Sequence, residues 1–144
     1  MHKEKKMKKT IAEVNADYAL LLSIADKKLP VKLAYAISKN IAKLEAERKT
    51  SEAERIKLCE RYAKKDENGE FILTKSVIDG QQVSGYQIED EAEFAKQLQE
   101  LLALEVEIDL MQVPISVLDQ LDSDRYDPLT PAQIHDLTWM INED

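Results

Sequence analysis

Cysteine, glycine and proline are scarce in this chain of 144 residues and long apolar runs are absent, and each shortage excludes a class of protein. The single cysteine, Cys59, excludes an intramolecular disulfide framework. Three glycines and four prolines leave little room for the many tight turns of an all-β architecture. No apolar run approaches the roughly 20 residues that a membrane-spanning helix needs. We therefore expect a helix-rich globular protein with no membrane segment.

The first nine residues, MHKEKKMKK, are basic like the start of a secretory signal. The segment that follows is interrupted by Glu13, Asn15 and Asp17 and lacks a cleavage site. The sequence therefore predicts a cytoplasmic protein. Residues 1–9 are interpreted as a disordered basic tail of a single domain that spans residues 1–144.

Charge is distributed very unevenly along the chain, whose net charge is −8. Residues 1–65 carry 17 basic and 9 acidic side chains, whereas residues 87–144 carry 2 basic and 15 acidic ones. Such asymmetry suits a nucleic-acid contact from the basic part or a basic-protein contact from the acidic part. It also suits internal or subunit-to-subunit complementarity, which is the simplest interpretation.

The helical part of the chain covers residues 10–65. Apolar residues at steps of three and four predict one helix over 10–28 and a second, longer stretch over 30–65. Pro30 suits the first position of a helix, where its missing N–H has no partner to lose. A tight corner is therefore expected between two helices that form an N-terminal helical hairpin.

The middle of the long stretch is polar. Its apolar seam is interrupted by Arg48, Ser51 and Arg55, so the segment around them should be exposed. Ser51 and Glu54 have the spacing of a helix start, which leaves open a break at this point. We favour one continuous helix, because serine and threonine break helices only mildly.

Residues 66–144 are interpreted as a small sheet with further helices. The segments 71–78 and 82–88 flank Asp79-Gly80, a strong signal for a β-hairpin. From 105 to 110 apolar and acidic residues alternate, which predicts a half-buried strand and a third partner for the hairpin.

Two more helices are indicated in this part of the chain. One begins near Asp90, and the last begins at Thr130, where a capping residue precedes a proline. The predicted fold is therefore α+β and helix-dominated, with a small antiparallel sheet of about three strands, helices over one sheet face and a C-terminal helix.

Several segments together resemble an uncharacterised family of small phage and prophage proteins from Gram-positive bacteria. The similar segments are Lys28-Leu29-Pro30-Val31-Lys32, Lys43-Leu44-Glu45, Glu54-Arg55-Ile56-Lys57-Leu58 with Tyr62, Asp66-Glu67-Asn68-Gly69, and Leu101-Leu102 followed by Glu105-Val106-Glu107-Ile108. They cover roughly residues 28–110. The resemblance implies a phage origin and a host-cytoplasm setting. It implies no activity and assigns no functional residue.

No pattern in the chain indicates catalysis or a bound cofactor. The histidines are His2, in the basic tail, and His135, whose neighbour Asp136 points in a different direction on a helix. Cys59 lies mid-helix among apolar residues, where a core role is expected. The three glycines fit no phosphate-binding loop. We expect no enzyme activity, cofactor or metal, and nucleic-acid binding is disfavoured because the basic N-terminal residues lack interleaved aromatic residues.

Acidic residues in the C-terminal part are the main candidates for a binding surface. Glu105, Glu107 and Asp109 share one strand face, with neighbours roughly 6.5 Å apart. A metal-dependent enzyme could use this row, but metal sites converge ligands from several elements, so a solvated edge is favoured. With Asp119, Asp122, Asp124 and Asp127, the row could imitate a phosphate backbone.

Two functional hypotheses follow for a non-enzymatic binding protein. In the first, a phage accessory protein inhibits a host defence factor through its acidic surface. In the second, a virion-assembly or structural accessory protein self-associates through its long helix, whose centre carries Arg48 and Arg55. The expected partner is a host or phage protein or a second copy of the chain.

Overall fold

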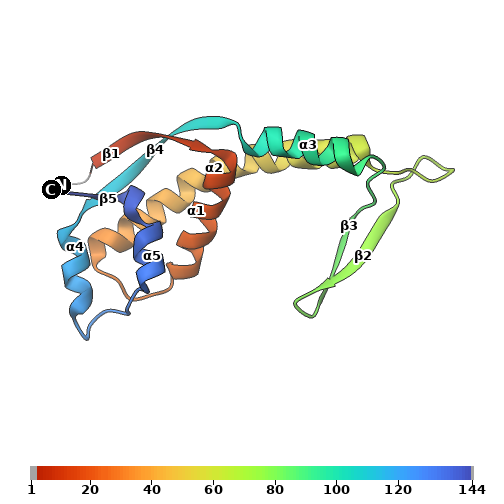
Figure 1. Ribbon diagram of the computed structural model, residues 1–144. Coiled ribbons are helices and arrows are strands. Elements are labelled where there is room, and N and C mark those ends of the chain that lie inside the picture. The colour runs from red at the N-terminus through yellow and green to blue at the C-terminus, as the bar shows by residue number, and fades with distance from the viewer. Residues whose placement is uncertain (1–2, 144) are drawn as a thin grey trace. The chain divides into compact units, whose positions relative to one another are not determined.

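The computed structural model describes residues 3–143 and has the α+β fold class that the sequence predicts (Figure 1). The chain divides into two compact units. Unit 1 comprises residues up to Lys49 together with those from Glu105 onward, and unit 2 comprises Thr50–Leu104. Unit 1 is built from two separate segments of the sequence, because the acidic strand at Glu105 belongs with the start of the chain.

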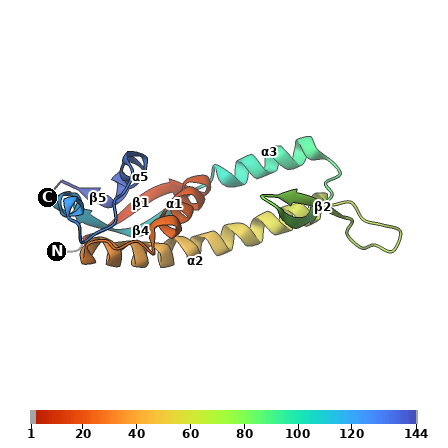
Figure 2. The same ribbon diagram turned by 90° about the horizontal axis from the view of Figure 1, so that it is seen from below.

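Unit 1 contains both ends of the described chain. Its elements are β1 (Lys3–Thr10), α1 (Ile11–Ile24), the first part of α2 (Val31–Tyr62), β4 (Glu105–Pro114), α4 (Ser116–Asp119), η1 (Gln120–Asp122), α5 (Pro131–Asp136), η2 (Thr138–Met140) and β5 (Ile141–Asn142). The strand order is β1-β4-β5, antiparallel between β1 and β4 and parallel between β4 and β5. Figures 1 and 2 show α1 and the first part of α2 along one face of this sheet.

The basic segment at the start of the chain is a strand and not the disordered tail that its composition predicts. Lys3–Thr10 forms β1 and pairs along its whole length with β4. Met7 lies between the pairs Lys5-Lys6 and Lys8-Lys9, opposite Ile108, and packs against the core. The prediction is wrong because Lys3–Thr10 is ordered by pairing with an acidic segment that lies about a hundred residues later in the sequence, which no local pattern reveals. His2 lies outside the described residues.

Strand β1 leads into α1 without a loop. The Thr10 hydroxyl accepts a hydrogen bond from the Glu13 backbone N–H at 3.1 Å, and the Glu13 carboxylate accepts one from the Thr10 N–H at 2.9 Å. This reciprocal capping box satisfies two N–H groups that have no partner within the helix. The start of α1 is thereby fixed relative to the sheet.

The core of unit 1 lies between the helices and the sheet. Its buried apolar residues come from α1, α2, β4 and the C-terminal segment, among them Leu21, Leu33, Leu110 and Met140, all at 0% exposure. Strand β4 buries Ile108 and Leu110 and half-buries Val106, as the alternation in the sequence predicts. Its partners are β1 and β5, however, and not the hairpin. Period-two alternation identifies a strand face but does not identify the neighbouring strand.

A buried asparagine holds α2 against β4. The Asn40 amide nitrogen donates to the Met111 carbonyl at 3.0 Å, and the Met111 backbone N–H donates to the Asn40 carbonyl oxygen at 2.7 Å. Asn40 is 0% exposed. The Asn40 side chain therefore provides Met111 of β4 with the two hydrogen bonds that a neighbouring strand would otherwise make. Water is excluded from this place, so the backbone groups need a partner within the protein.

Replacing Asn40 with leucine should destabilise the protein by roughly 2–5 kcal/mol, because the backbone N–H and C=O of Met111 each lose a buried hydrogen bond. Chemical denaturation followed by circular dichroism measures the loss. Ser38→Ala, at an exposed position one half-turn earlier, is the control and should stay close to wild type. An Asn40→Leu protein as stable as wild type would show that the clamp contributes nothing.

Helix α2 is one continuous helix from Val31 to Tyr62, which is the favoured interpretation of the sequence. Its middle is less exposed than expected. Ser51 is only 7% exposed and Arg48 is half-buried, whereas Arg55 is exposed. At these positions of the apolar seam, the small Ser51 and the long Arg48 side chain take the place of apolar residues and are still partly or fully buried.

Unit 2 contains the rest of α2, the strands β2 (Leu73–Ile78) and β3 (Gln81–Tyr86), and α3 (Glu91–Leu102). Strands β2 and β3 form a two-stranded sheet of their own, and the turn between them has positive φ at Asp79 (51°) and Gly80 (78°). These angles suit the two-residue turn that the Asp-Gly pair predicts. Helix α3 begins after Asp90, whose carboxylate accepts a hydrogen bond from the Glu93 N–H at 3.1 Å.

Candidate partner-binding surfaces

The acidic row on β4 is exposed, as predicted, but it faces lysines. Glu107 lies directly opposite Lys8 of β1, and Asp109 lies opposite Lys6. Side chains opposite each other in an antiparallel pair have Cβ atoms roughly 5 Å apart, close enough for opposite charges to attract. Glu105 lies opposite Thr10 and lacks such a basic neighbour across the strands. The row is therefore half of a mixed-charge surface.

The remaining predicted acidic residues do not join this row. Asp122 ends η1 and Asp124 lies in the loop beyond it, both exposed. Asp109 lies five residues before Pro114, the last residue of β4. Roughly 16 Å of strand therefore separate Asp109 from the segment that leads to Asp122 and Asp124. Asp127 has a structural role, because its carboxylate accepts a hydrogen bond from the Lys28 N–H at 2.7 Å. Its own N–H donates to the Lys28 carbonyl at 2.8 Å, which fixes the corner between α1 and α2.

The carboxylates of the row are also poorly placed for a metal. Residues 3–143 contain no group of three histidine, cysteine, aspartate or glutamate side chains close enough to hold a metal ion. Alternate residues of one strand spread their carboxylates along a line and do not converge on a point.

The two candidate arginines of α2 are engaged within the chain. The Arg48 guanidinium lies 4.9 Å from the centre of the Tyr18 ring, a cation–π contact in unit 1. The Arg55 guanidinium in unit 2 binds the Glu52 carboxylate, with a closest distance of 2.6 Å. That hydrogen bond raises the pKa of Arg55 above its ordinary value. Neither arginine is a free anchor for a partner.

Sequence reasoning missed a buried ion pair in unit 1. The Lys9 ammonium lies 2.8 Å from the Asp17 carboxylate and 4.4 Å from the centre of the Trp139 ring, and Lys9 is only 7% exposed. Burial raises the pKa of the Asp17 carboxyl, and the hydrogen bond from Lys9 opposes that rise. Nothing in the lysine run distinguishes Lys9 from its exposed neighbours, so only the fold identifies it.

Because acidic and basic side chains face each other, reversing the charge of both Glu107 and Asp109 to lysine should destabilise the protein by about 1 kcal/mol through like-charge pairs. Adding Lys6→Glu and Lys8→Glu should restore the stability. Glu105→Lys is the matched control from the same row and should have little effect, because Thr10 lies opposite it. Thermal unfolding at low salt measures all three variants. Equal losses for the control and the double reversal would contradict the proposed pairing.

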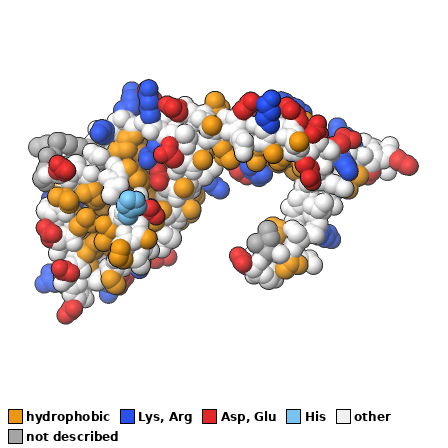
Figure 3. All heavy atoms as spheres, in the orientation of Figure 1, with side chains coloured by type: hydrophobic (Ala, Val, Ile, Leu, Met, Phe, Trp, Pro, Cys, Tyr) orange, Lys and Arg blue, Asp and Glu red, His pale blue; other side chains and the backbone are white. Residues whose placement is uncertain are grey.

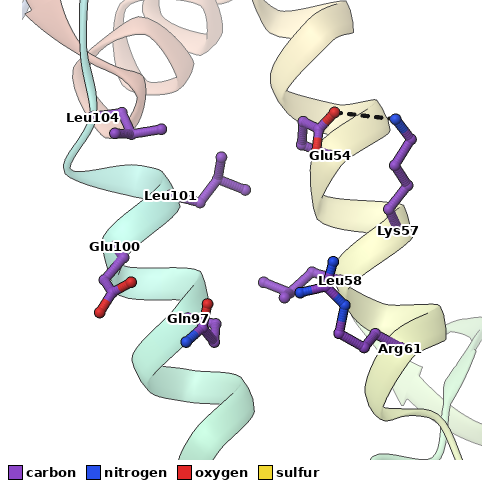
Figure 4. Close-up of a pocket in the computed structure, with 8 residues that line it drawn as sticks. All are labelled: Glu54, Lys57, Leu58, Arg61, Gln97, Glu100, Leu101 and Leu104. Atoms are coloured by element: carbon purple, nitrogen blue, oxygen red, sulfur yellow. Dashed lines mark hydrogen bonds and ion pairs between the residues drawn. The ribbon is translucent and has the colours of Figure 1, made fainter.

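Unit 2 contains a groove of about 280 Å³ between the second part of α2 and α3. Leu58 of α2 and Leu101 of α3 point toward one another across it (Figure 4). The other residues that line the groove are Glu54, Lys57, Arg61, Gln97, Glu100 and Leu104. The floor is therefore apolar, and both edges carry charge.

The charges at the two edges of the groove differ in their partners. The Lys57 ammonium is paired with the Glu54 carboxylate of the same helix at 3.2 Å. Arg61, on α2, and Glu100, on α3, are both exposed, and neither forms an ion pair with another part of the chain that the structure describes. Figure 3 shows acidic and basic side chains interspersed over the helices of unit 2.

Little of unit 2 is buried. Among its described side chains only Ser51, Leu58, Cys59 and Ala63 are buried, and α3 contributes none. The apolar stripe of α3 is half-buried against α2, where the Phe94 and Tyr62 rings meet edge to face with centroids 6.2 Å apart. The hairpin exposes Leu73, Val77 and Val83, at 57%, 66% and 42%. The sequence pattern predicts that α3 is amphipathic, but it does not predict that the apolar stripe is only half-buried.

Comparison with protein-family models, with curated proteins and with solved structures finds no match for this chain. Within residues 3–143, no helix combines the length and the apolar character needed to cross a membrane. The functional argument therefore rests on the surfaces described above.

Proposed function

We propose that the chain is a non-enzymatic binding protein and that unit 2 is the part that contacts its protein partner. The observation that carries this proposal is the shortage of buried side chains in unit 2 beside an apolar groove and an exposed hairpin. A 12-residue helix such as α3 is marginal in water unless its apolar face is covered. A two-stranded hairpin alone is also marginal.

The composition of unit 2 supports the same function. Large apolar side chains at exposed positions, rimmed by charge, are typical of surfaces that a partner covers. Unit 1, in contrast, has a continuous core and an internally balanced sheet surface, so it is suited to act as the scaffold. From the resemblance to phage proteins we further propose a phage accessory protein in the host cytoplasm, with a host or phage protein or a second copy of the chain as its partner.

Inhibition of a host defence factor through the acidic surface has less support than binding of a partner at the groove. Lys6 and Lys8 lie beside the row and reduce its negative potential, and Asp127 is used within the fold. An imitation of a phosphate backbone needs uncompensated charges at regular intervals. We therefore place the primary contact on unit 2 and keep the acidic row as the comparison surface in the test.

The proposal is tested by affinity retention from lysate of a Gram-positive host that also expresses the untagged chain, with the retained proteins identified by mass spectrometry. Wild type is compared with Leu104→Lys, which alters the groove, and with the triple reversal of Glu105, Glu107 and Asp109 to lysine. We expect a specific protein that the wild type and the acidic variant retain and that the groove variant loses. Circular dichroism of each variant checks that the fold is intact.

Retention that survives Leu104→Lys but fails in the acidic variant would contradict the proposal and assign binding to β4. Because Leu104 is 55% exposed, lysine at this position should cost little stability, which makes the comparison informative.

A further inference from the structure

We propose that the groove between α2 and α3 of unit 2 binds the same groove of a second copy of this chain. The inference rests on the proposed function, because it names the partner of the same surface. The two helices run antiparallel, since Tyr62 meets Phe94 at one end while Glu54 and Leu104 line the groove at the other. Two such helix pairs, placed face to face, form a four-helix arrangement that covers Leu101 and Leu104 of both copies above the already buried Leu58.

The edge charges of the groove are self-complementary. Its α2 edge carries Lys57 and Arg61 together with Glu54, which is paired with Lys57, so this edge is basic on balance, and its α3 edge carries Glu100. A two-fold axis along the groove sets α2 of one copy against α3 of the other, so each interaction occurs twice. The basic edge of one copy then faces Glu100 of the other, and Arg61 lies roughly one helical turn from that Glu100 along the groove, within reach of its long side chain.

The choice of this axis depends on which charged residues of the groove already form an ion pair within the chain. An axis across the groove would set α2 against α2 and pair Arg61 with Glu54 of the other copy. Glu54 already binds Lys57 within its own chain, whereas Arg61 and Glu100 make no ion pair with the rest of residues 3–143. Pairing Arg61 with Glu100 uses the two unpaired charges and leaves the existing ion pair intact.

The mixed sign of the edges also favours a second copy over an unrelated partner. A strongly acidic or basic partner is best matched by edges of one sign, because potentials across an interface are complementary. A self-complementary surface instead needs both signs on the same patch, placed on opposite sides of the symmetry axis. The groove has this arrangement, with basic residues on α2 and an acidic residue on α3.

Sedimentation velocity of the full chain at several concentrations tests the proposal. Wild type should self-associate to a dimer, and Leu104→Lys should be a monomer. Leu22→Lys, at an exposed position of α1 in unit 1, is the matched control and should remain a dimer. A wild-type monomer at every concentration, or a dimeric Leu104→Lys protein, would overturn the proposal.

Charge swaps test the assigned pairing. Arg61→Glu and Glu100→Arg each place like charges together twice per dimer, so each variant alone should self-associate about tenfold or more weakly. An equimolar mixture of the two single variants should form a heterodimer, because both opposite-charge pairs are then recreated. The combined variant Arg61→Glu/Glu100→Arg should also dimerise.

The alternative pairing has its own signature. If Glu54→Arg rescues Arg61→Glu and Glu100→Arg does not, then α2 packs against α2 and the axis proposed above is wrong. If the wild-type chain is monomeric but the lysate protein is still lost in Leu104→Lys, then the second copy is excluded while the binding function of unit 2 stands.

Discussion

The pairing of β1 with β4 joins the two ends of the chain and determines how the rest of it can be arranged. Eight residues of β1 are matched with residues 105–112 of β4, so the basic start of the sequence lies beside an acidic segment about a hundred residues away. Residues 1–49 and 105–144, which make up unit 1, carry 13 basic and 16 acidic side chains. The large charge asymmetry along the sequence is thus mostly cancelled once these segments fold together. Unit 2, from Thr50 to Leu104, is therefore an insertion between the two sequence segments of unit 1.

Three sets of polar contacts fix the helices of unit 1 to the rest of that unit. The capping box at Thr10 sets the start of α1, the mutual hydrogen bonds of Lys28 and Asp127 set the corner before α2, and Asn40 attaches α2 to β4. Each satisfies backbone groups that the local secondary structure leaves without partners. Unit 1 therefore has both a continuous apolar core and a defined set of polar contacts, which together specify one arrangement of its helices.

Local features of this fold can be predicted from the sequence, and long-range ones cannot. The hairpin at Asp79-Gly80, the helix start at Thr130 and the inward face of Ile108 and Leu110 are all encoded within a few residues. The partner of β4 is not, because alternation gives a face and no neighbour, and the lysines of β1 resemble those of a disordered tail. The alternation also predicts that Glu105, Glu107 and Asp109 lie at the surface, where the structure has them. Their lysine neighbours, the structural role of Asp127 and the ion pair of Lys9 depend on tertiary contacts that no local pattern contains.

The contrast between a self-sufficient unit 1 and an under-buried unit 2 is the basis of the functional account. Its most direct test is amide hydrogen exchange of the full chain, measured residue by residue at low and at high protein concentration. If a second copy covers the apolar stripe of α3, protection of residues 91–102 should rise with concentration, while protection of β4 stays constant. Protection in α3 that equals that of β4 at every concentration would contradict the account, because unit 2 would then be stable without a partner.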